Sequence, residues 1–228
     1  MTIYKSGFLI INKPSGPTSH DIIDQLRKIT NIKKIGHAGT LDPFASGVLI
    51  VAIGREATRE ISQFVKLDKK YIATLYLGAN TDTYDKTGKR TERYSDETEI
   101  TENQIQKITK DFIGQQKQIP PMYSAKKIKG KKLYELARKG IEIKREPVKI
   151  EIYNIKLLEF KWPYLKIKIH CTSGTYIRSL AYDLGTQLGC GAYLDELERV
   201  AVGNCDIKQA IDLRDIDKNN WIDHLINS

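Results

Sequence analysis

One stretch decides how the chain is interpreted: Gly36-His37-Ala38-Gly39-Thr40-Leu41-Asp42-Pro43-Phe44-Ala45-Ser46-Gly47, followed directly by Val48-Leu49-Ile50-Val51-Ala52-Ile53. The first part predicts a loop, because glycine frees the backbone angle φ and proline removes a hydrogen-bond donor. The second part is apolar and rich in β-branched residues, which predicts a buried central strand. We therefore expect Asp42 on a tightly turned loop beside the hydrophobic core.

Two interpretations of Asp42 follow from this position. A carboxylate fixed beside a buried strand costs desolvation free energy unless a cation or backbone donors receive it. Such a placement is typical of a nucleophile. The alternative is a plain turn in which Asp42 accepts a local backbone hydrogen bond, and by composition alone this is the commoner arrangement.

Composition places the chain among folded globular proteins. Its 228 residues are 40% apolar and 29% charged, which is neither a disordered nor a membrane composition. No apolar run approaches the roughly 20 residues of a membrane-spanning helix, and residues 1–7 are too short and polar for a signal peptide. The cysteines, Cys171, Cys190 and Cys205, lack CxxC spacing, which argues against a disulfide framework and a zinc site. We expect a cytoplasmic protein.

The net charge of +9 is concentrated in one segment. Between Lys126 and Ile150, ten Lys or Arg and three Glu contribute +7. Such a block suggests a polyanionic partner, most simply nucleic acid, although a solvated lysine-rich face is an equal alternative. We interpret the segment as a mobile, positively charged flap with a short helix ending at Gly140. Its first lysines are Lys126, Lys127, Lys129, Lys131 and Lys132.

Hydrophobic periodicity predicts strands interspersed with helices. Strands are expected at residues 8–11, 48–53, 69–77, 148–152, 165–171 and 197–202. Capping patterns predict helices after Thr18 and Thr101, and further helices are expected from Arg55 and from Thr175 to Gly189. Residues 80–99 predict an exposed excursion, and the residues after 206 predict only short helical fragments. This order of elements indicates an α+β fold.

Four further residues invite a functional interpretation. Arg178 lies in the first turn of a predicted helix, where the helix dipole disfavours a cation, so it is either held by a carboxylate or exposed. Tyr71 and Tyr76 are five residues apart on a predicted strand and should face opposite sides. Lys13 could contact phosphate, help to structure an active site, or be a plain surface lysine.

The central stretch resembles, without gaps, the catalytic-loop signature of the TruB/dyskerin-type tRNA pseudouridine synthases. Other blocks similar to that family follow in the family's order. They are Asn12-Lys13-Pro14-Ser15-Gly16, Lys70-Tyr71, Leu77-Gly78 to Gly88, Pro120-Pro121-Met122-Tyr123-Ser124-Ala125 and Gly174-Thr175-Tyr176-Ile177-Arg178. Together the resemblance covers roughly residues 7 to 203.

The resemblance implies roles for the residues at the matching positions. Asp42 would be the nucleophile, and Arg178 would pair with it and keep it ionised and aimed. Tyr71 would stack on the uracil ring. His37 would fill the place that the flipped base leaves, which is physically sensible because flipping costs a few kcal/mol of stacking. Asp85 aligns with a family aspartate of the active-site polar network.

The resemblance also implies RNA contacts and an overall architecture. Lys13, Tyr176 and the lysines of the basic segment would contact RNA. The fold would be the pseudouridine synthase fold: α+β, with a mixed, largely antiparallel sheet, a central RNA-binding cleft and a basic thumb-like insertion. One catalytic domain would cover residues 1–228, with the insertion at about 120–148 and a short tail at about 204–228. We expect the chain to stop before a C-terminal RNA-binding domain.

The implied reaction is isomerisation of uridine to pseudouridine at position 55 in the T-loop of tRNA. It needs no cofactor and no metal. The partner would be the T-arm of tRNA, with no membrane and no guide RNA, and the chain is expected to be a monomer. The alternatives are the same chemistry on another structured RNA, or a tRNA-folding chaperone whose catalysis is dispensable.

Overall fold

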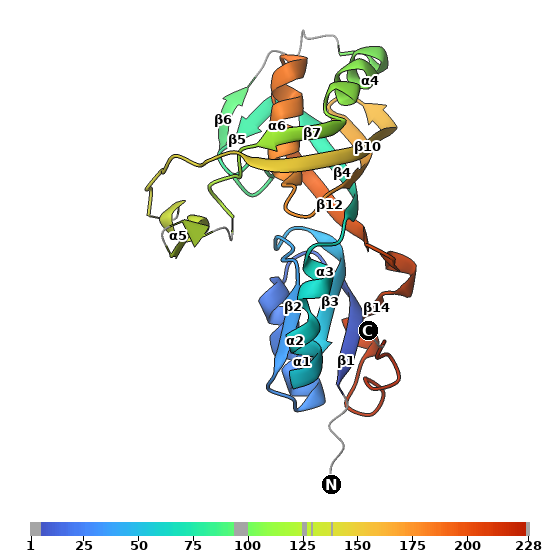
Figure 1. Ribbon diagram of the computed structural model, residues 1–228. Coiled ribbons are helices and arrows are strands. Elements are labelled where there is room, and N and C mark those ends of the chain that lie inside the picture. Colours follow the sequence, from blue (N-terminus) through green and yellow to red (C-terminus); the bar gives the residue numbers. More distant parts are fainter. Residues whose placement is uncertain (1–5, 94–99, 125–126, 129, 138, 227–228) are drawn as a thin grey trace. The chain divides into compact units, whose positions relative to one another are not determined.

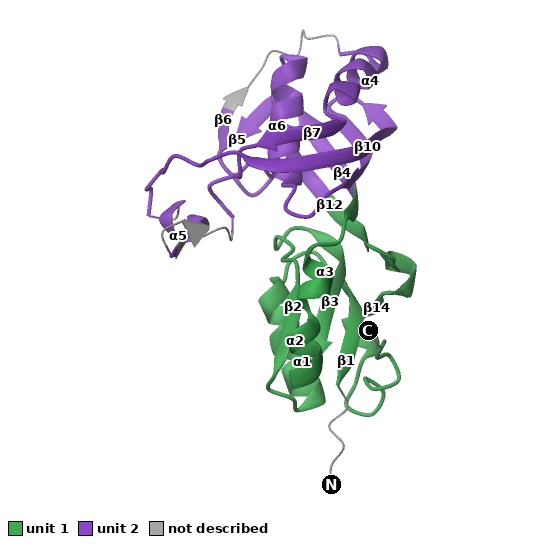
Figure 2. Ribbon diagram, viewed as in Figure 1, with its two compact units in different colours: residues 1–71, 197–228 green, residues 72–196 purple. Residues whose placement is uncertain are grey.

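The structure is a computed structural model that describes residues 6–93, 100–124, 127–128, 130–137 and 139–226 (Figure 1). The chain divides into two compact units (Figure 2). Unit 1 comprises residues 1–71 and 197–228, and unit 2 comprises residues 72–196. The chain passes between them within two strands, β4 (Lys69–Leu77) and β12 (Ala192–Val202). Both ends of the chain therefore build the same unit.

Unit 1 is a sheet with helices and a C-terminal segment packed on it. Its strands are β1 (Gly7–Lys13), β2 (Ile35–Ala38), β3 (Ser46–Ile53), the second half of β12, β13 (Cys205–Asp206) and β14 (Ile211–Asp212). Its helices are α1 (Ser19–Thr30), α2 (Arg55–Glu60), α3 (Ser62–Val65), and the short 3-10 helices η1 (Ile207–Gln209) and η2 (Leu213–Asp215). The strands of unit 1 are hydrogen-bonded in the order β14-β1-β3-β12. In addition, β2 pairs with β3 and β13 pairs with β12.

The two edges of β3 are used differently. Along one edge, β1 pairs antiparallel with the strand from Gly47 to Ile53. The other edge is shared: β2 pairs with residues 50–53, and β12 pairs in parallel at Ser46 and Gly47. The loop that carries Asp42 leaves β2 and returns into β3 where this edge changes partner. Strand pairing therefore fixes both ends of the loop.

The structure corrects two expectations in this region. Gly36, His37 and Ala38 belong to β2 and not to the loop, because they pair with β3 despite the glycine. The helix expected from Arg55 is broken into two short helices, α2 and α3, which meet at Ile61. The capped helix after Thr18 is confirmed, since Thr18 and Asp21 form a complete capping box.

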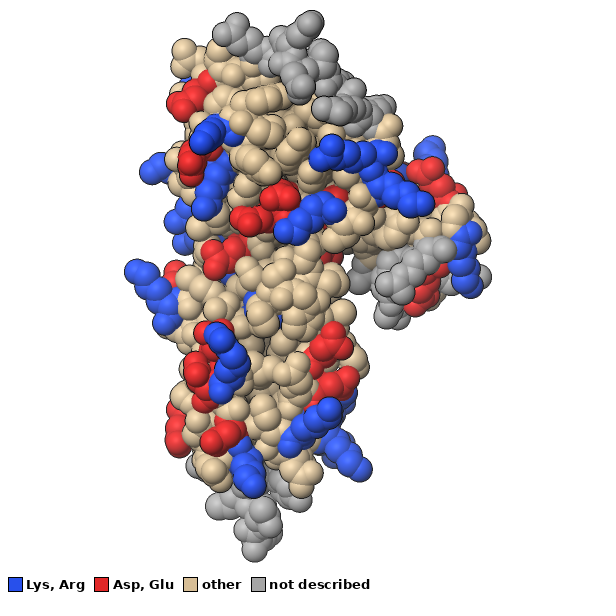
Figure 3. Space-filling view, turned by 180° about the vertical axis from the view of Figure 1, so that it is seen from behind, with Lys and Arg blue, Asp and Glu red and all other residues tan. Residues whose placement is uncertain are grey.

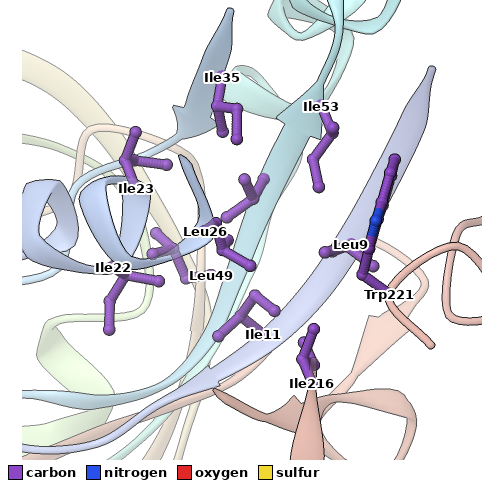
Figure 4. Close-up of a cluster of buried hydrophobic side chains, with 11 residues drawn as sticks. Leu9, Ile11, Ile22, Ile23, Leu26, Ile35, Leu49, Ile53, Ile216 and Trp221 are labelled. Carbon is purple, nitrogen blue, oxygen red and sulfur yellow. The ribbon is translucent and has the colours of Figure 1, made fainter. Parts of the chain in front are cut away.

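The main core of unit 1 lies between the sheet, α1 and the C-terminal segment. Leu9 and Ile11 of β1, Leu49 of β3 and Leu26 of α1 are fully buried there. Figure 4 shows Ile216 and Trp221 of the C-terminal segment reaching the same cluster. The C-terminal residues, for which only short helical fragments were expected, thus also contribute short strands and part of the core.

Unit 2 is a second sheet-and-helix layer. Its sheet order is β12-β4-β11-β10-β7, with β7 (Gly114–Gln118), β10 (Val148–Lys161) and β11 (Tyr164–Cys171). The helices α4 (Glu102–Asp111) and α6 (Ile177–Leu188) pack against one another, and α4 also packs on β10. The predicted α+β class with a mixed, mostly antiparallel sheet is confirmed.

Residues 80–99 differ from the expected exposed excursion. Their described part forms a small hairpin of β5 (Ala79–Thr81) and β6 (Arg90–Arg93). Asn80, Thr81 and Asp85 are buried. They are buried because the turn between the strands packs back on unit 2, where Asp85 forms a bridge to Leu194 of β12. Residues 94–99 lie outside the described part.

The basic segment is described in part. It contains a short hairpin of β8 (Lys127–Ile128) and β9 (Lys131–Lys132), then the helix α5 (Leu133–Ala137). A short helix was predicted here and is confirmed, although it ends at Ala137 and not at Gly140. On the side seen in Figure 3, Lys and Arg side chains are mixed with Asp and Glu over both units. Within the described residues, no helix is both long enough and apolar enough to cross a membrane.

Candidate active site

Neighbouring segments hold the backbone of the Asp42 loop almost residue by residue. The Ser19 hydroxyl, at the start of α1, accepts from the Leu41 N–H at 3.0 Å and lies 3.2 Å from the Leu41 carbonyl, to which it donates. The Asp42 carbonyl accepts from the Ala45 N–H at 3.1 Å, which closes a turn. Asp42 itself is half-buried between buried Leu41 and exposed Pro43. The carboxylate is thus mounted on a backbone with little freedom to move.

The Asn12–Gly16 segment holds the other half of the loop. The Gly16 N–H donates to the Pro43 carbonyl at 2.8 Å, and the Ser15 hydroxyl donates to the Phe44 carbonyl at 2.8 Å. Two segments that resemble one family in sequence are therefore joined by hydrogen bonds in space. Their joint effect is to fix the direction in which the Asp42 side chain leaves the loop.

Lys13 is the cation beneath this loop. Its side chain is fully buried, and its Nζ donates to the carbonyls of Pro14 at 2.9 Å, Pro17 at 2.8 Å and Pro43 at 3.2 Å. Burial lowers the pKa of Lys13 to about 8, while the nearby Asp42 carboxylate acts in the opposite direction. The expected contact with RNA phosphate does not fit this geometry, because the three N–H donors of the ammonium group are used inside the protein. The geometry supports the alternative, a lysine that structures the site.

Arg199 of β12 lies where the edge of β3 passes from pairing with β2 to pairing with β12. It is 2% exposed, and its guanidinium donates through Nε to the Val48 carbonyl at 2.8 Å and through Nη2 to the Gly39 carbonyl at 2.9 Å. It therefore ties the residue after β2 to the start of β3, on both sides of the Asp42 loop. A buried charge is tolerated when it is well hydrogen-bonded, as here.

Gly47 is required at the contact with Arg199. Its φ is +100°, and a Cβ atom there would collide with the Arg199 backbone, lying 2.8 Å from its nitrogen and closer still to its carbonyl oxygen. Glycine is the residue that adopts this φ without strain and leaves room for the neighbouring strand. The last glycine of the central stretch thus permits β12 to approach β3.

His37 lies on β2, a few residues before Asp42. Its side chain is partly exposed, but Nδ1 is buried and has no hydrogen-bond partner among the described residues. Burial, together with the charge of Arg199, lowers the pKa of His37. The ring is therefore neutral near pH 7, which suits stacking better than ion pairing.

Tyr71 lies on β4, where burial alternates strictly along the strand. Tyr71 is 8% exposed and Tyr76 is partly exposed. The expectation that the two tyrosines face opposite sides is confirmed. Tyr76 instead stacks on Tyr193, with ring centroids 5.0 Å apart, and the Arg90 guanidinium lies over its ring.

Unit 2 contributes a buried ion pair. The Nη1 atom of Arg178 lies 3.5 Å from Oδ2 of Asp85, and both side chains are about 95% buried. The other oxygen of Asp85, Oδ1, accepts from the Thr83 hydroxyl at 2.8 Å and from the Thr87 N–H at 2.9 Å. The expectation that a carboxylate holds Arg178 is confirmed for Asp85. A pairing with Asp42, which belongs to the other unit, stays a prediction.

The start of α6 is tied to the chain before the basic segment. The Tyr176 N–H donates to Oε1 of Gln118 at 2.8 Å, and Nε2 of Gln118 donates to the Tyr176 carbonyl at 3.0 Å. The Arg178 Nη2 donates to the Tyr123 carbonyl at 2.8 Å, and Ser179 donates to the Ile119 carbonyl at 2.9 Å. Two more blocks of the resemblance are thereby joined. The Tyr176 ring is partly exposed.

The remaining predicted RNA contacts are not tested by the structure. Lys126 and Lys129 lie outside the described residues. Lys127, Lys131 and Lys132 are placed on β8 and β9 by their backbone alone. Within unit 1, in contrast, Lys13 contacts the Asp42 loop, and His37 lies on the strand that leads into that loop.

Comparison with known proteins gives this geometry a family. A family model described as "TruB family pseudouridylate synthase (N terminal domain)" matches residues 27–177, and one described as "tRNA pseudouridylate synthase B C-terminal domain" matches residues 178–227. The chain belongs to the TruB family of pseudouridylate synthases. The second match extends the family assignment to residue 227. The short motifs used from the sequence did not extend beyond residue 203 and gave no signal for it.

Curated relatives agree with this assignment. The chain is 53% identical over 199 residues to the tRNA pseudouridine synthase B of Protochlamydia amoebophila, covering 86% of this chain and 74% of the relative. It is 47% identical over 221 residues to the protein of the same name from Clostridium tetani, covering 97% and 76%. The family assignment therefore holds along nearly the whole chain.

A solved structure resembles the fold. One chain of a Cbf5-Nop10-Gar1 complex matches with a TM-score of 0.72 and 31% identity, covering 92% of this chain. The TruB-family chain described here spans about half of that solved chain, 53% of its length. The match supports the pseudouridine synthase fold.

Sequence reasoning missed several residues of the site. Arg199 was seen only as part of a strand, although a charged residue at an inward position between Leu197 and Ala201 was an available signal. Ser19 and Gln118 were not singled out from the sequence. Ser19 contacts Leu41, which lies 22 positions further along the chain, and Gln118 contacts Tyr176, which lies 58 positions further. No local sequence pattern encodes such contacts.

Proposed function

We propose that this chain isomerises uridine to pseudouridine at position 55 in the T-loop of tRNA, with Asp42 as the nucleophile. The observation that carries the proposal is the Asp42 loop of this TruB-family chain. In this loop, each residue from Leu41 to Phe44 has a backbone N–H or carbonyl group in a hydrogen bond. A preorganised carboxylate of this kind suits attack on, or stabilisation of, an electron-poor carbon.

The proposed reaction rearranges one bond of the nucleotide. The bond between N1 of uracil and C1′ of ribose breaks, the base turns, and a bond forms between C5 and C1′. C5 then loses its proton and N1 gains one, so the product is an isomer of the substrate. Asp42 would act at ribose C1′ or at base C6, which resembles the nucleophile of a glycosidase in the first case.

Other residues would position the base. Tyr71, on the buried side of β4, would stack on the flipped uracil and could help to remove the C5 proton. His37, whose neutral ring is partly exposed, would take the place of the base in the T-loop. Arg178 would pair with Asp42 and be held from behind by Asp85, to which it is already bound.

The basic segment from Lys126 to Ile150 would grip the RNA through phosphate contacts, which position a nucleic acid without reading its sequence. Limited proteolysis within this segment, with and without tRNA, tests this role. Binding should protect the segment. Equal cleavage in both states would contradict the proposed grip. A cytoplasmic location and a monomeric state remain predictions that accompany the proposal.

The function is tested by mapping pseudouridine on an unmodified tRNA transcript after incubation with the enzyme alone. Carbodiimide labelling followed by primer extension should show one stop, in the T-loop. A transcript with U55 replaced by C is the matched control and should show none. A stop only on ribosomal or messenger RNA would move the substrate to another RNA. Salt-sensitive tRNA binding without any stop would favour the folding-chaperone alternative.

A further inference from the structure

The sheet of unit 2 has one open face, and its charge pattern is unusual. The inward side chains of β10 and β11, among them Ile152, Ile155 and Ile167, are buried. The outward side chains of β7, β10 and β11 are exposed or partly exposed. This open face comprises Gln115, Lys117, Lys149, Glu151, Tyr153, Asn154, Lys156, Glu159, Lys161, Tyr164, Lys166, Lys168 and His170.

Strand register places lysines directly opposite lysines on the open face. Lys117 of β7 faces Lys149 of β10, and Lys156 of β10 faces Lys168 of β11. All four are exposed. Within the described part of the chain, no carboxylate lies at ion-pair distance from any of them. Like charges in facing positions destabilise a sheet, so this arrangement is not explained by folding stability.

Aromatic rings lie among these lysines. Tyr153 is 44% exposed and contacts the ring of His170, with centroids 4.8 Å apart. Tyr164 is 47% exposed and meets Tyr76 of the next strand edge to face at 5.5 Å. Exposed rings on a basic sheet are typical of surfaces on which unpaired bases stack.

We propose that the open face of β7, β10 and β11 is an RNA-binding surface, with its lysines at phosphates and its tyrosines at unpaired bases. Charge complementarity selects the partner, because this surface carries six lysines and two glutamates. RNA is the polyanion that the proposed function already supplies. The inference rests on that function only in this choice. It assigns the face no part in catalysis.

The test is a salt titration of binding to an unmodified tRNA transcript. The test variant carries Lys→Gln at 117, 156, 166 and 168, all exposed on the open face. It keeps Lys149, which belongs to the basic segment. The matched control carries Lys→Gln at 28, 107, 110 and 208, which removes the same charge from exposed positions away from the open face. We expect the test variant to bind at least tenfold more weakly, and its slope of log K against log salt to be shallower by about 3. The control should change less than twofold.

Lysine acetylation of the wild-type protein provides a second readout that needs no variant. Bound tRNA should protect Lys117, Lys156, Lys166 and Lys168 of the open face, while Lys28, Lys107, Lys110 and Lys208 stay reactive. The inference would be overturned if the two sets of substitutions weakened tRNA binding equally, or if the test variant bound as tightly as the wild type. It would also be overturned if bound tRNA left the lysines of the open face unprotected. At saturating enzyme, the test variant should form pseudouridine on a T-arm hairpin in a single turnover at the same rate as the wild type. Absence of product with the wild type would instead contradict the proposed function.

Discussion

At the scale of single residues, the site depends on buried cations placed against backbone carbonyls. Lys13 and Arg199 both lie within the protein and hold the carbonyls of Pro43 and Gly39, one on each side of Asp42. A lysine and an arginine do this differently. The ammonium of Lys13 can lose a proton at accessible pH, whereas a guanidinium does not. The two cations should therefore respond differently to pH.

Lys13 predicts a descending limb in the pH profile. Because its pKa is about 8, deprotonation above that pH leaves two N–H donors for three carbonyls, and the turnover rate should fall. The variant Lys13→Arg should lose this limb, even at a lower rate overall, while exposed Lys33→Arg should keep it. Steady-state rates from pH 6 to 10 measure this. A limb near pH 8 that persists in Lys13→Arg would contradict the assignment.

Folding stability should move in the opposite direction. The folded-state pKa of Lys13 is lowered, so between about pH 8 and 10.5 the unfolded chain binds the proton more than the folded chain does. The contribution of Lys13 to the free energy of unfolding therefore rises with pH in this window. Urea titrations at the same pH values separate this effect from the loss of turnover.

The buried pair of Asp85 and Arg178 predicts a large stability effect. Asp85→Asn removes the negative charge that faces Arg178, and breaking a buried pair in this way costs about 3 kcal/mol. Asp82→Asn is the control in the same turn, where Asp82 is exposed and, among the described residues, accepts from the Lys89 N–H alone. Its cost should stay below about 1 kcal/mol. Equal midpoints of urea unfolding for the two variants would contradict the role assigned to Asp85.

At the scale of elements, the shared edge of β3 is the decisive feature. The strand accepts β2 over one part of its edge and β12 over another, and the Asp42 loop occupies the transition. A helix or a second hairpin at this edge would not leave a short loop held at both ends. The position of Asp42 is thus a consequence of strand pairing as much as of the loop's own sequence.

Gly47→Ala tests this pairing. The new methyl group would meet the Arg199 backbone and would sit at φ +100°, so the free energy of unfolding should fall by clearly more than about 1 kcal/mol. Gly114→Ala is the control, since Gly114 has a φ of +105° with nothing within 4 Å of the added atom. The Gly114 variant therefore measures the cost of a positive φ alone, without the collision expected at Gly47. A Gly47 variant no less stable than the Gly114 variant would show that β12 does not need the close approach.

Much of the secondary structure could be predicted from the sequence. The strand β3 follows from an unbroken apolar run, and α1 and α4 follow from capping boxes that the structure contains. The role of Lys13 could not be predicted, because a lysine beside two prolines is the same in sequence whether it is exposed or buried. Arg199 lies 160 residues from the carbonyl of Gly39, and only the topology brings them together.

At the scale of the whole molecule, the chain closes one unit with its two ends. It leaves unit 1 after Tyr71 and returns at Leu197. The C-terminal segment then pairs β14 with β1 and forms the bridge between Ile226 and Phe8. The strand that carries Lys13 is thus flanked by residues from the far end of the sequence. The C-terminal segment should be needed for a stable unit 1.

Trp221→Ala tests this dependence. Trp221 is 6% exposed within the main core, so its truncation should lower the free energy of unfolding by about 3 to 5 kcal/mol. Trp221→Phe should recover most of the loss. Trp162→Ala, at a partly exposed position of unit 2, should cost less. If Trp221→Ala unfolds at the same urea concentration as the wild type, the C-terminal segment is not part of the core.

If Asp42 performs the chemistry, as we propose, its carboxylate is required even for a single turnover of bound tRNA. Wild type, Asp42→Asn and the control Asp24→Asn, a partly exposed position on α1, are each incubated at saturating concentration with unmodified tRNA, and pseudouridine at position 55 is followed in a single turnover. We expect normal product with Asp24→Asn and none with Asp42→Asn, although the Asp42→Asn variant should still fold and bind tRNA. Product formed by a folded Asp42→Asn variant at a rate near that of the wild type would contradict this expectation.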